Sequence, residues 1–365
     1  MAYFELRPTC ASPDYPIYGA EWAGTSDPSW TRTDAASSFS DPNPYYAGMS
    51  TTPSSPFDNI SPWKDMVISE DSEAGTLVSI PKFYFKWTRT GDKMKLQISM
   101  HQYDGFLTSP AHADRGDGKG ERDIVYVGRY HCASDYKSKT GVTPRADKTI
   151  TAYRNNIHNL GNTIFQWDLA LLWTIRMLFL VEFANWNVKT IGYGGGEGTT
   201  TPHKNGRTDT LPYHTGTEST NPSSVIGDIH YRYIENLWSN TDCWIDGVYF
   251  MNGGQYCFTN PQTYDFSQSG TLVGNISGTY QSGIMNFTSS NVVGLEYAMS
   301  PILNSSVTMT TYCCAATWGN FPNASTKYAL RISGSNANEG CSLFNYITSY
   351  AYTAAGYSAR LMKLP

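Results

Sequence analysis

The chain has 365 residues, of which 40% are hydrophobic and 14% aromatic, including 26 tyrosines and 10 tryptophans. This composition provides for a large buried core and excludes a disordered chain. The net charge of −5 gives no basic field for nucleic acid or for an anionic membrane surface. The seven scattered cysteines form no C-x-x-C pair, which favours free thiols in a protein made in the cytosol.

Residues 1–62 are rich in Pro, Ser, Asp and Thr, and their repeated D-P and S-P steps set turns and oppose long helices. The opening MAYFELRPTC lacks a basic region followed by an apolar run, so we expect no secretory signal. Aromatic residues such as Trp22, Trp30 and Phe57 recur in this stretch, although a free linker does not need them. We therefore predict an extended N-terminal arm over residues 1–62, which packs on a neighbour or on its own domain and serves attachment or oligomer contacts. One domain over residues 63–365 follows it.

From Val78 the pattern becomes β. Phe83, Phe85 and Trp87 alternate with more polar residues, and RTGD forms a turn before KLQI, which predicts a hairpin. A charged, glycine-rich loop and the short strand IVYVGRYH follow. Four acids of that loop offer oxygen ligands for Ca²⁺: Asp114, Asp117, Glu121 and Asp123. Their spacing does not match the 12-residue calcium loop and nearby cations offset their charge, so we predict no metal site.

The most apolar stretch runs from Thr163 to Trp186 and is broken by Asp168, Arg176 and Glu182, and the helix that we predict in it covers Thr163 to Asn185. A membrane span tolerates such charges poorly, so we predict a helix buried on most sides. The rest of the chain is rich in loops, with short strand candidates at WIDGVYFM, QYCF, GTLVGNI, GLEYAM, KYALRIS and YSARLMKL. These elements predict an α+β fold with few helices, many short strands and long ordered loops.

Between Tyr297 and Tyr357 the only charged residues are Lys327, Arg331 and Glu339. An ordinary soluble surface is about a quarter or more Lys, Arg, Asp and Glu. The stretch is instead rich in Tyr, Ser and Asn, the residues with which antibody paratopes combine rigid rings and adaptable hydrogen bonds. It therefore indicates a ligand-binding surface, and the alternative is that it forms ordinary internal β structure.

The stretch IENLWSNTDCWIDGVYF places two tryptophans around a polar loop that leads into a strand. It resembles the G-N-x-W-E-W-x-D-G element of formylglycine-generating enzymes, although Ser239 replaces the glycine and Asp242–Cys243 replace the first aromatic–acid pair. The ending GYSARLMKLP is similar to that family's closing G-[FY]-x-x-R-L strand. The resemblance covers roughly residues 80–365 and implies a C-type lectin-like fold. The scaffold residues that it implies are Trp238, Asn240, Trp244, Asp246, Gly247 and Arg360.

A closer resemblance is to the phage-encoded variable proteins of diversity-generating retroelements and to related tail proteins of gut-bacterial phages. In that family a reverse transcriptase miscopies adenine, which scatters substitutions over Asn-type codons of a low-charge C-terminal segment. The resemblance implies a variable ligand-binding segment over residues 312–352. Its candidate positions are Tyr312, Cys313, Cys314, Trp318, Asn320, Asn336, Ala337, Asn338, Glu339, Cys341, Asn345, Tyr346, Tyr350 and Tyr352. Trp318 and Glu339 do not arise from an Asn codon by adenine change alone, so they are either fixed or derived from other adenine-bearing codons.

This resemblance implies a receptor-binding protein at the tail tip or fibre of a phage or prophage, whose variable face binds a bacterial surface protein or glycan and sets host tropism. It further implies a homotrimer held together by the arm, contacts with other tail proteins, and a binding protein rather than an enzyme. We expect no cofactor, no nucleic-acid partner and no insertion into a membrane.

Two alternatives remain. An oxidase like the formylglycine-generating enzymes needs two closely spaced reactive cysteines and copper, whereas Cys313 and Cys314 are adjacent and Cys341 is distant. A calcium-dependent lectin needs E-P-N, Q-P-D or W-N-D ligand signatures, which the sequence lacks. Carbohydrate binding without calcium and without diversification stays open.

Overall fold

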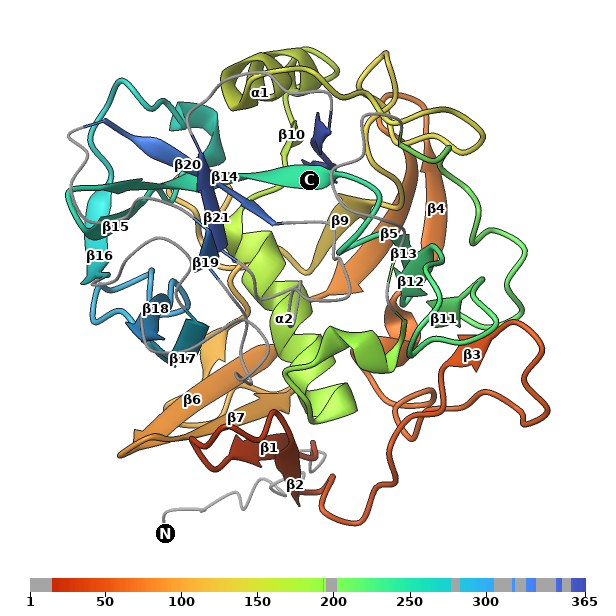
Figure 1. Ribbon diagram of the computed structural model, residues 1–365. Coiled ribbons are helices and arrows are strands. Elements are labelled where there is room, and N and C mark those ends of the chain that lie inside the picture. Colours follow the sequence, from red (N-terminus) through yellow and green to blue (C-terminus); the bar gives the residue numbers. More distant parts are fainter. Residues whose placement is uncertain are drawn as a thin grey trace, which may run out of the picture.

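The computed structural model describes residues 15–192, 194, 202–276, 283–304, 317–318, 326–332, 346–349 and 356–365. Among the described residues, strands make up 34% and helices 11%, and the several sheets are arranged around the helix α2 (Figure 1). The predicted α+β class and C-type lectin-like fold are therefore wrong, and the fold is mainly β. The physical reason is that many stretches expected to be loops pair their backbones into short strands.

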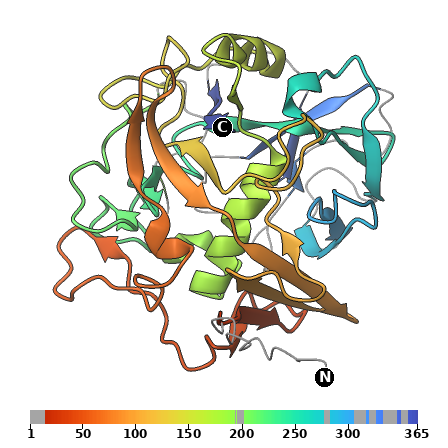
Figure 2. The same cartoon turned by 180° about the vertical axis from the view of Figure 1, so that it is seen from behind.

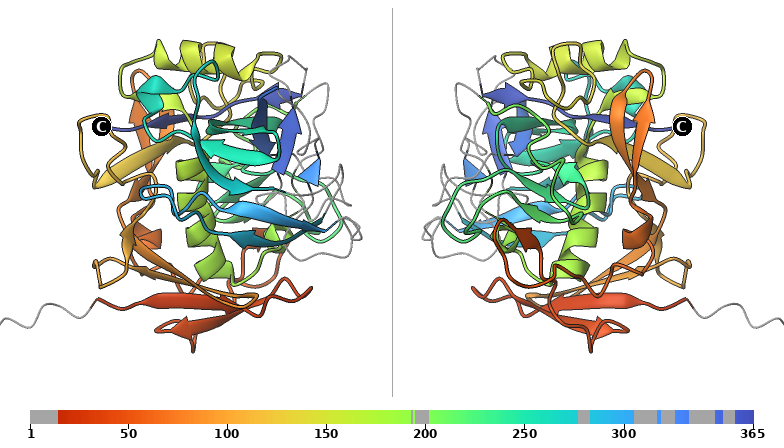
Figure 3. Two further views of the ribbon diagram at one scale, coloured as in Figure 1. Left: turned by 90° about the vertical axis from the view of Figure 1, so that its left-hand side faces the viewer. Right: turned by 90° about the vertical axis from the view of Figure 1, so that its right-hand side faces the viewer.

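The helix α2, Leu169–Phe183, runs through the middle of the molecule, and all 15 of its residues are buried. Asp168 begins it, because the Asp168 carboxylate accepts a hydrogen bond of 2.9 Å from the Leu171 amide. Ala184 ends it in the left-handed region, with φ 48°. The side views show strands on both sides of this helix along its length (Figure 3). The predicted buried helix is thus confirmed, although the residues before Asp168 form the strand β10 instead.

The sheet below α2 has the order β2-β1-β7-β6-β8. Its strands are β1 (Tyr18–Trp22), β2 (Trp30–Asp34), β6 (Tyr84–Thr90), β7 (Lys93–Ser99) and β8 (Leu107–Thr108). The predicted hairpin is confirmed, since Thr90 pairs with Lys93 across a turn in which Gly91 has φ 61°. α2 packs against β1 and β7 of this sheet.

The described part of the predicted arm, residues 15–62, packs on its own domain, which was one of the two alternatives, and it forms strands within that domain rather than a separate extended arm. Strands β1 and β2 pair into the sheet of β6 and β7, and Trp22, Trp30 and Phe57 belong to the main hydrophobic core. The Trp63 indole N–H donates to the Leu178 carbonyl of α2 at 3.1 Å. Large aromatic rings gain most when they reach a core, so this stretch folds onto its own domain.

A second sheet has the order β10-β23-β9-β5-β4 and joins the end of the chain to its first third. Its strands are β4 (Ile68–Asp71), β5 (Gly75–Pro81), β9 (Ile124–Gly128), β10 (Ile164–Gln166) and β23 (Leu361–Lys363). The β4–β5 hairpin, in orange, faces the viewer in Figure 2. The helix α1 (Ile150–His158) packs beside β10 and starts at Thr149, whose side chain accepts from the Ala152 amide.

A small four-stranded sheet has the order β13-β12-β11-β3. Its strands are β3 (Tyr45–Tyr46), β11 (Gly216–Thr217), β12 (Ile229–Tyr231) and β13 (Ile234–Glu235). Short 3-10 turns lie at Trp63–Asp65 (η1), Val188–Thr190 (η2) and Pro261–Thr263 (η3). Among the described residues, no helix is both long and apolar enough to cross a membrane.

The largest sheet has seven strands, six of them in the order β16-β15-β14-β20-β21-β19, with β22 parallel to the start of β14. These strands are β14 (Asp242–Met251), β15 (Gly254–Cys257), β16 (Thr271–Asn275), β19 (Thr317–Trp318), β20 (Tyr328–Ile332), β21 (Tyr346–Ser349) and β22 (Tyr357–Ser358). Beside it lies a hairpin of β17 (Gly283–Thr288) and β18 (Ser300–Asn304). The predicted strand at GLEYAM is wrong, because residues 294–299 form turns and the strand starts at Ser300.

Glu182 places a carboxylate near the end of α2 in a fully buried position. It accepts hydrogen bonds from the Ser55 hydroxyl at 2.7 Å and the Tyr231 hydroxyl at 3.0 Å. The Arg232 guanidinium donates to both carboxylate oxygens, at 2.5 and 3.2 Å. Burial of a charge is tolerated here because an opposite charge and several donors compensate for lost hydration.

We predict that Glu182→Ala lowers the free energy of unfolding by about 3–5 kcal/mol, because it leaves the Arg232 guanidinium buried without its main partner. Urea denaturation followed by tryptophan fluorescence measures this change. The matched control is Glu73→Ala at an exposed position, which should change stability by less than about 0.5 kcal/mol. Equal effects of the two substitutions would contradict the prediction.

Candidate functional site

The candidate site is the edge of the largest sheet that is formed by β20, β21 and β19, all of which belong to residues 312–352. β20 pairs antiparallel with the core strand β14, and β21 pairs antiparallel with β20. β19 pairs parallel with β21 and is the last strand at that edge. The predicted variable segment therefore contributes the outer strands of a sheet whose inner strands belong to the scaffold (Figure 1).

Both described cations of the low-charge stretch hold β20 to the scaffold. Arg331 forms an ion pair with Asp242 of β14, and its guanidinium lies 4.1 Å from the centre of the Tyr357 ring. The Lys327 ammonium lies 4.6 Å from the centre of the Tyr249 ring and donates to the Gln268 carbonyl. These cation–π and charged contacts give the two residues structural roles.

Two of the fourteen predicted variable positions lie in described strands. Trp318 of β19 pairs with Ile347, and Tyr346 of β21 pairs with Thr317. The other twelve lie outside the described residues: Tyr312, Cys313, Cys314, Asn320, Asn336, Ala337, Asn338, Glu339, Cys341, Asn345, Tyr350 and Tyr352. Their role in ligand binding stays a prediction.

The W-x-D-G element lies in β14, where each of its residues makes a specific contact. Trp244 is fully buried and donates its indole N–H to the Lys148 carbonyl at 3.1 Å. Asp246 forms a two-bond ion pair with Arg154 of α1, with both nitrogen–oxygen distances at 2.7 Å. Gly247 has φ 72°, and a β-carbon there would lie 2.8 Å from the Tyr264 ring. Glycine is therefore required by both the backbone conformation and the close approach.

A second buried ion pair lies beside the first and joins three distant segments. The Asp168 carboxylate accepts hydrogen bonds of 2.7 Å from both the Arg115 guanidinium and the Tyr264 hydroxyl. Backbone bridging between Asp168 and Asp246 links this pair to β14. Burial beside the Asp168 carboxylate raises the pKa of the Tyr264 hydroxyl well above its usual value, so it stays protonated and donates.

The loop before β14 is fixed by the other predicted scaffold residues. The Asn240 side chain accepts from the His203 amide at 2.7 Å and donates to the His203 carbonyl at 3.1 Å. The Trp238 indole N–H donates to the Gly192 carbonyl at 3.2 Å, while its ring packs edge-on against Phe179 of α2. Both side chains therefore bridge separate parts of the chain.

Arg360 fixes the last strands from within the core. Its guanidinium donates to the carbonyls of Gly128 at 2.6 Å, Arg129 at 2.7 Å, and Glu235 at 2.5 Å. Burial lowers the pKa of this fully enclosed guanidinium to about 10, so it stays charged at neutral pH. Since β22 and β23 flank Arg360, the end of the predicted variable segment leads directly into a fixed anchor.

The described cysteines do not provide an oxidase site. Cys132, Cys243 and Cys257 are buried, and burial raises the pKa of Cys243 and of Cys257 to about 12. At neutral pH such thiols are protonated and are poor nucleophiles and copper ligands. The oxidase alternative thus depends on Cys313, Cys314 and Cys341, which lie outside the described residues.

Three of the four acids named in the glycine-rich loop are paired with cations. Asp117 pairs with Arg122, whereas Glu121 and Asp123 both contact Lys82, at 3.6 and 2.7 Å. No cluster of three or more potential metal ligands occurs among the described residues. In these pairs a lysine or arginine side chain, rather than a bound metal ion, neutralises the carboxylate.

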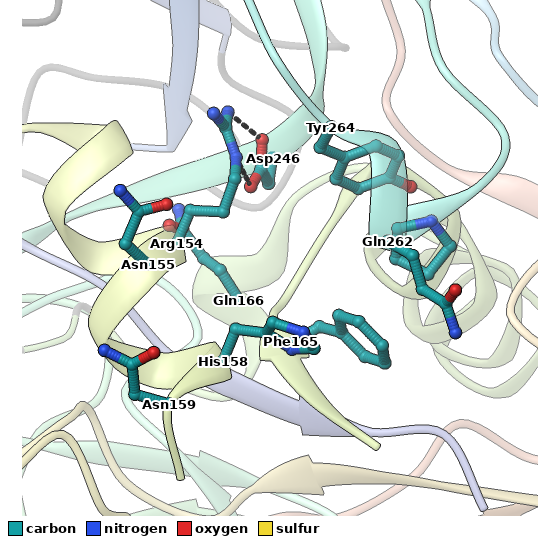
Figure 4. A pocket seen from close by; sticks show the side chains of 10 residues that line it. Arg154, Asn155, His158, Asn159, Phe165, Gln166, Asp246, Gln262 and Tyr264 are labelled. Carbon is teal, nitrogen blue, oxygen red and sulfur yellow. Dashed lines mark hydrogen bonds and ion pairs between the residues drawn. The ribbon is translucent and has the colours of Figure 1, made fainter. Parts of the chain in front are cut away.

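Sequence reasoning missed a pocket between α1, β10, β14 and η3, which Figure 4 shows from close by. The pocket has a volume of about 210 Å³, and Asp246 is the one predicted residue that lines it. Its other lining residues are Arg154, Asn155, His158, Asn159, Phe165, Gln166, Pro261, Gln262 and Tyr264. They come from three separate stretches, and the spacing of Asn155, His158 and Asn159 on one helix face was the only local signal.

No protein-family model matches the chain, and no curated protein matches it. The functions proposed below therefore rest on the sequence pattern and the geometry of this chain.

We predict that Gly247→Ala destabilises the protein by at least about 2 kcal/mol more than Gly141→Ala. Both glycines have φ near +70°, at 72° and 74°, but the added β-carbon meets Tyr264 at the first position and nothing within 4 Å at the second. The left-handed backbone costs both variants about 1 kcal/mol, and only Gly247→Ala also forces Tyr264 away from Asp168. Urea denaturation of both variants measures the difference, and equal losses would refute the steric role of Tyr264.

Proposed function

We propose that this chain is a receptor-binding protein of a phage or prophage tail, related to the variable proteins of diversity-generating retroelements. Its segment 312–352, diversified at Asn-type codons, binds a protein or glycan on the bacterial surface. The observation that carries this proposal is the position of β20, β21 and β19 at one edge of the largest sheet, outside the scaffold strand β14.

An edge position suits a segment whose residues change. A core strand is packed on both faces, so substitutions there alter volume and cost stability. β14 is such a strand, with nine of its ten residues buried. Among the described strands, β19 pairs with β21 alone, so it lies at the end of the strand order rather than between two neighbours.

The charge distribution supports a role in binding. The two described cations between Tyr297 and Tyr357 are engaged with Asp242, Tyr249 and Tyr357. Glu339, the third charged residue of this stretch, lies outside the described residues. A surface of Tyr, Asn and Ser binds with small losses of side-chain entropy and without desolvating charges.

Residues 312–352 are attached to the scaffold within the segment and after its end, which suits a surface whose side chains vary. The Arg331–Asp242 ion pair holds β20, the innermost of its three described strands, to β14, and Arg360 anchors the strands that follow the segment. We further propose that the protein acts as a homotrimer together with other tail proteins, because several copies of a weak site raise avidity. It acts in the virion, at the tail tip or fibre, without an enzymatic reaction or a cofactor.

We predict that the double variant Asn336→Ala/Tyr350→Ala loses at least about tenfold in adhesion to bacterial cells, because each residue contributes contacts that can exceed about 1 kcal/mol. The fluorescently labelled full chain is titrated against a panel of gut-bacterial strains, and thermal unfolding is followed in parallel. The melting temperature should stay within about 2 °C of the parent, because the segment lies outside the scaffold.

The matched control is Asn291→Ala/Tyr15→Ala, which removes the same side-chain types at exposed positions outside residues 312–352. It should leave adhesion unchanged. Equal adhesion of both double variants would contradict the proposed binding face, and unfolding of the first variant would support the alternative of internal β structure.

Diversification makes a separate prediction about the DNA. A near-copy of the region that encodes residues 312–352 should lie beside a reverse-transcriptase gene and differ from it mainly at adenines. Sequencing the flanking DNA checks this. Without such a copy, and with codons at the listed positions that are not related to Asn codons by adenine change, the retroelement part of the proposal would be wrong and the binding role would stand alone.

A further inference from the structure

An apolar groove of about 280 Å³ lies beside the start of β1 and the end of β7, where the described part of the chain begins. Its apolar lining residues are Tyr15, Pro16, Tyr18, Ile60 and Met100, and no charged residue lines it within the described ranges. Tyr15 is 40% exposed, whereas Tyr18, Ile60 and Met100 are partly buried and pack on the main core. The groove therefore leaves apolar surface in contact with water, and covering such surface is favourable.

The first described residue of the chain is fixed in the wall of this groove. The Tyr103 hydroxyl donates to the Tyr15 carbonyl at 2.7 Å. The Tyr15 ring stacks on His101, with centroids 5.9 Å apart and planes inclined by 7°. The residues that precede Tyr15 in the sequence therefore start from the groove itself.

These preceding residues have the sequence MAYFELRPTCASPD and lie outside the described residues. In an extended segment successive side chains alternate between two faces. Phe4 and Leu6 then share one face. The charged residues Glu5 and Arg7 share the opposite face. Such a segment can offer an apolar face to an uncharged groove while its charges stay in water.

The chain is long enough to bring this segment back to the groove. Leu6 lies nine residues before Tyr15, and nine extended residues span up to about 30 Å. Ser12 and Pro13 are residue types preferred at the first two positions of a type I turn, and Asp14 is also common in turns. A turn here reverses the chain just before Tyr15. So short a tether gives an effective concentration on the order of millimolar, which favours the chain's own segment over that of a second copy.

We propose that the groove binds residues 3–7 of its own chain. Phe4 and Leu6 enter the groove, where their burial covers the apolar residues that line it. Glu5 and Arg7 face the solvent. A segment from a second copy would lose translational and rotational freedom that the tethered segment has already lost, so docking within one chain is preferred.

This docking does not rest on the proposed receptor binding, because no described lining residue of the groove belongs to residues 312–352. It does bear on the proposed homotrimer. A segment that occupies its own groove does not join two copies, so the contacts between copies would have to come from elsewhere in the chain.

Site-specific photo-cross-linking of the full chain tests the docking. Benzoylphenylalanine, whose ketone bonds to nearby C–H groups on irradiation, replaces Phe4 in one variant and Glu5 in the matched control. Denaturing electrophoresis then separates cross-links within one chain from cross-links between chains. Mass spectrometry identifies the peptides that are joined.

The probe at position 4 should join the segment to residues 59–61 or to Met100 within a single chain. We expect at least about fivefold more of this product than with the probe at position 5, whose side chain lies on the opposite face of an extended segment. Ile60→Ser should lower the yield from position 4 about fivefold, because it removes apolar surface from the groove. Val293→Ser, at a residue that is 90% exposed and outside the groove, should leave the yield unchanged.

The proposal is overturned if positions 4 and 5 give equal yields, or if peptides of the groove are absent from the products. It is also overturned if the product joins two chains, which would assign the groove to a second copy and favour a homotrimer joined by its N-terminal residues. The comparison of positions 4 and 5 uses the parent groove, so it tests the docking even where Ile60→Ser lowers stability.

Discussion

A helix that is buried on every side must find partners for its polar groups inside the protein, and this constraint organises the fold. α2 carries Arg176 and Glu182 within its span and Asp168 at its start, all with no exposed surface. Hydration is lost at each of these groups, so each needs charges or hydrogen bonds from the surrounding chain. The apolar faces of α2 hold the sheets together, and its polar groups determine which segments of the chain pack against each end of the helix.

The partners of the two carboxylates come from widely separated parts of the chain. Asp168 is bound by Arg115 and Tyr264, and Glu182 is bound by Ser55 and Arg232. Each carboxylate thus joins a segment that precedes α2 to one that follows it. Non-local ties of this kind explain why the stretch predicted as an arm folds onto the domain, because Ser55 is needed at the end of α2.

Some of these partners require a costly backbone. Arg232, Tyr233, Asn236 and Asn240 all have φ between 45° and 69°, in the left-handed region. Such conformations cost of order 1 kcal/mol or more each and persist where the surroundings impose them. Here the gain is that Arg232 reaches Glu182, and that the carbonyl of Asn236 lies within reach of Arg360 at 3.3 Å.

Local patterns in the sequence were enough to predict the buried helix, the β6–β7 hairpin and the strands β9, β14, β15, β16 and β20. Each has a clear hydrophobic period or a turn signal within a few residues. The sheets to which β1, β2 and β3 belong could not be predicted, because strand pairing over long separations depends on partners that no local pattern identifies. The fold class was wrong for the same reason.

The two candidate sites also differ in how far the local sequence could predict them. The low charge of residues 297–357 is visible in the composition, whereas the pocket beside α1 exists only once α1, β10 and β14 meet. Gln166 read from the sequence is one amide in an apolar stretch. In the structure its Nε2 donates to the Trp244 carbonyl, and its Oε1 is buried without a hydrogen-bond partner among the described residues.

Buried polar residues with several partners differ from the residues of the outer strands in how much a substitution is expected to cost. Four buried residues each form hydrogen bonds with several partners inside the protein: Asp168, Glu182, Asp246 and Arg360. A substitution at any of them leaves a buried donor or acceptor without its hydrogen-bond partner. β19 and β21 are joined to the scaffold through β20, whose Arg331 forms an ion pair with Asp242 of β14. This arrangement supports the proposal that the edge formed by β21 and β19 carries the variable side chains, because the backbone pairing of a strand does not depend on which side chains it bears.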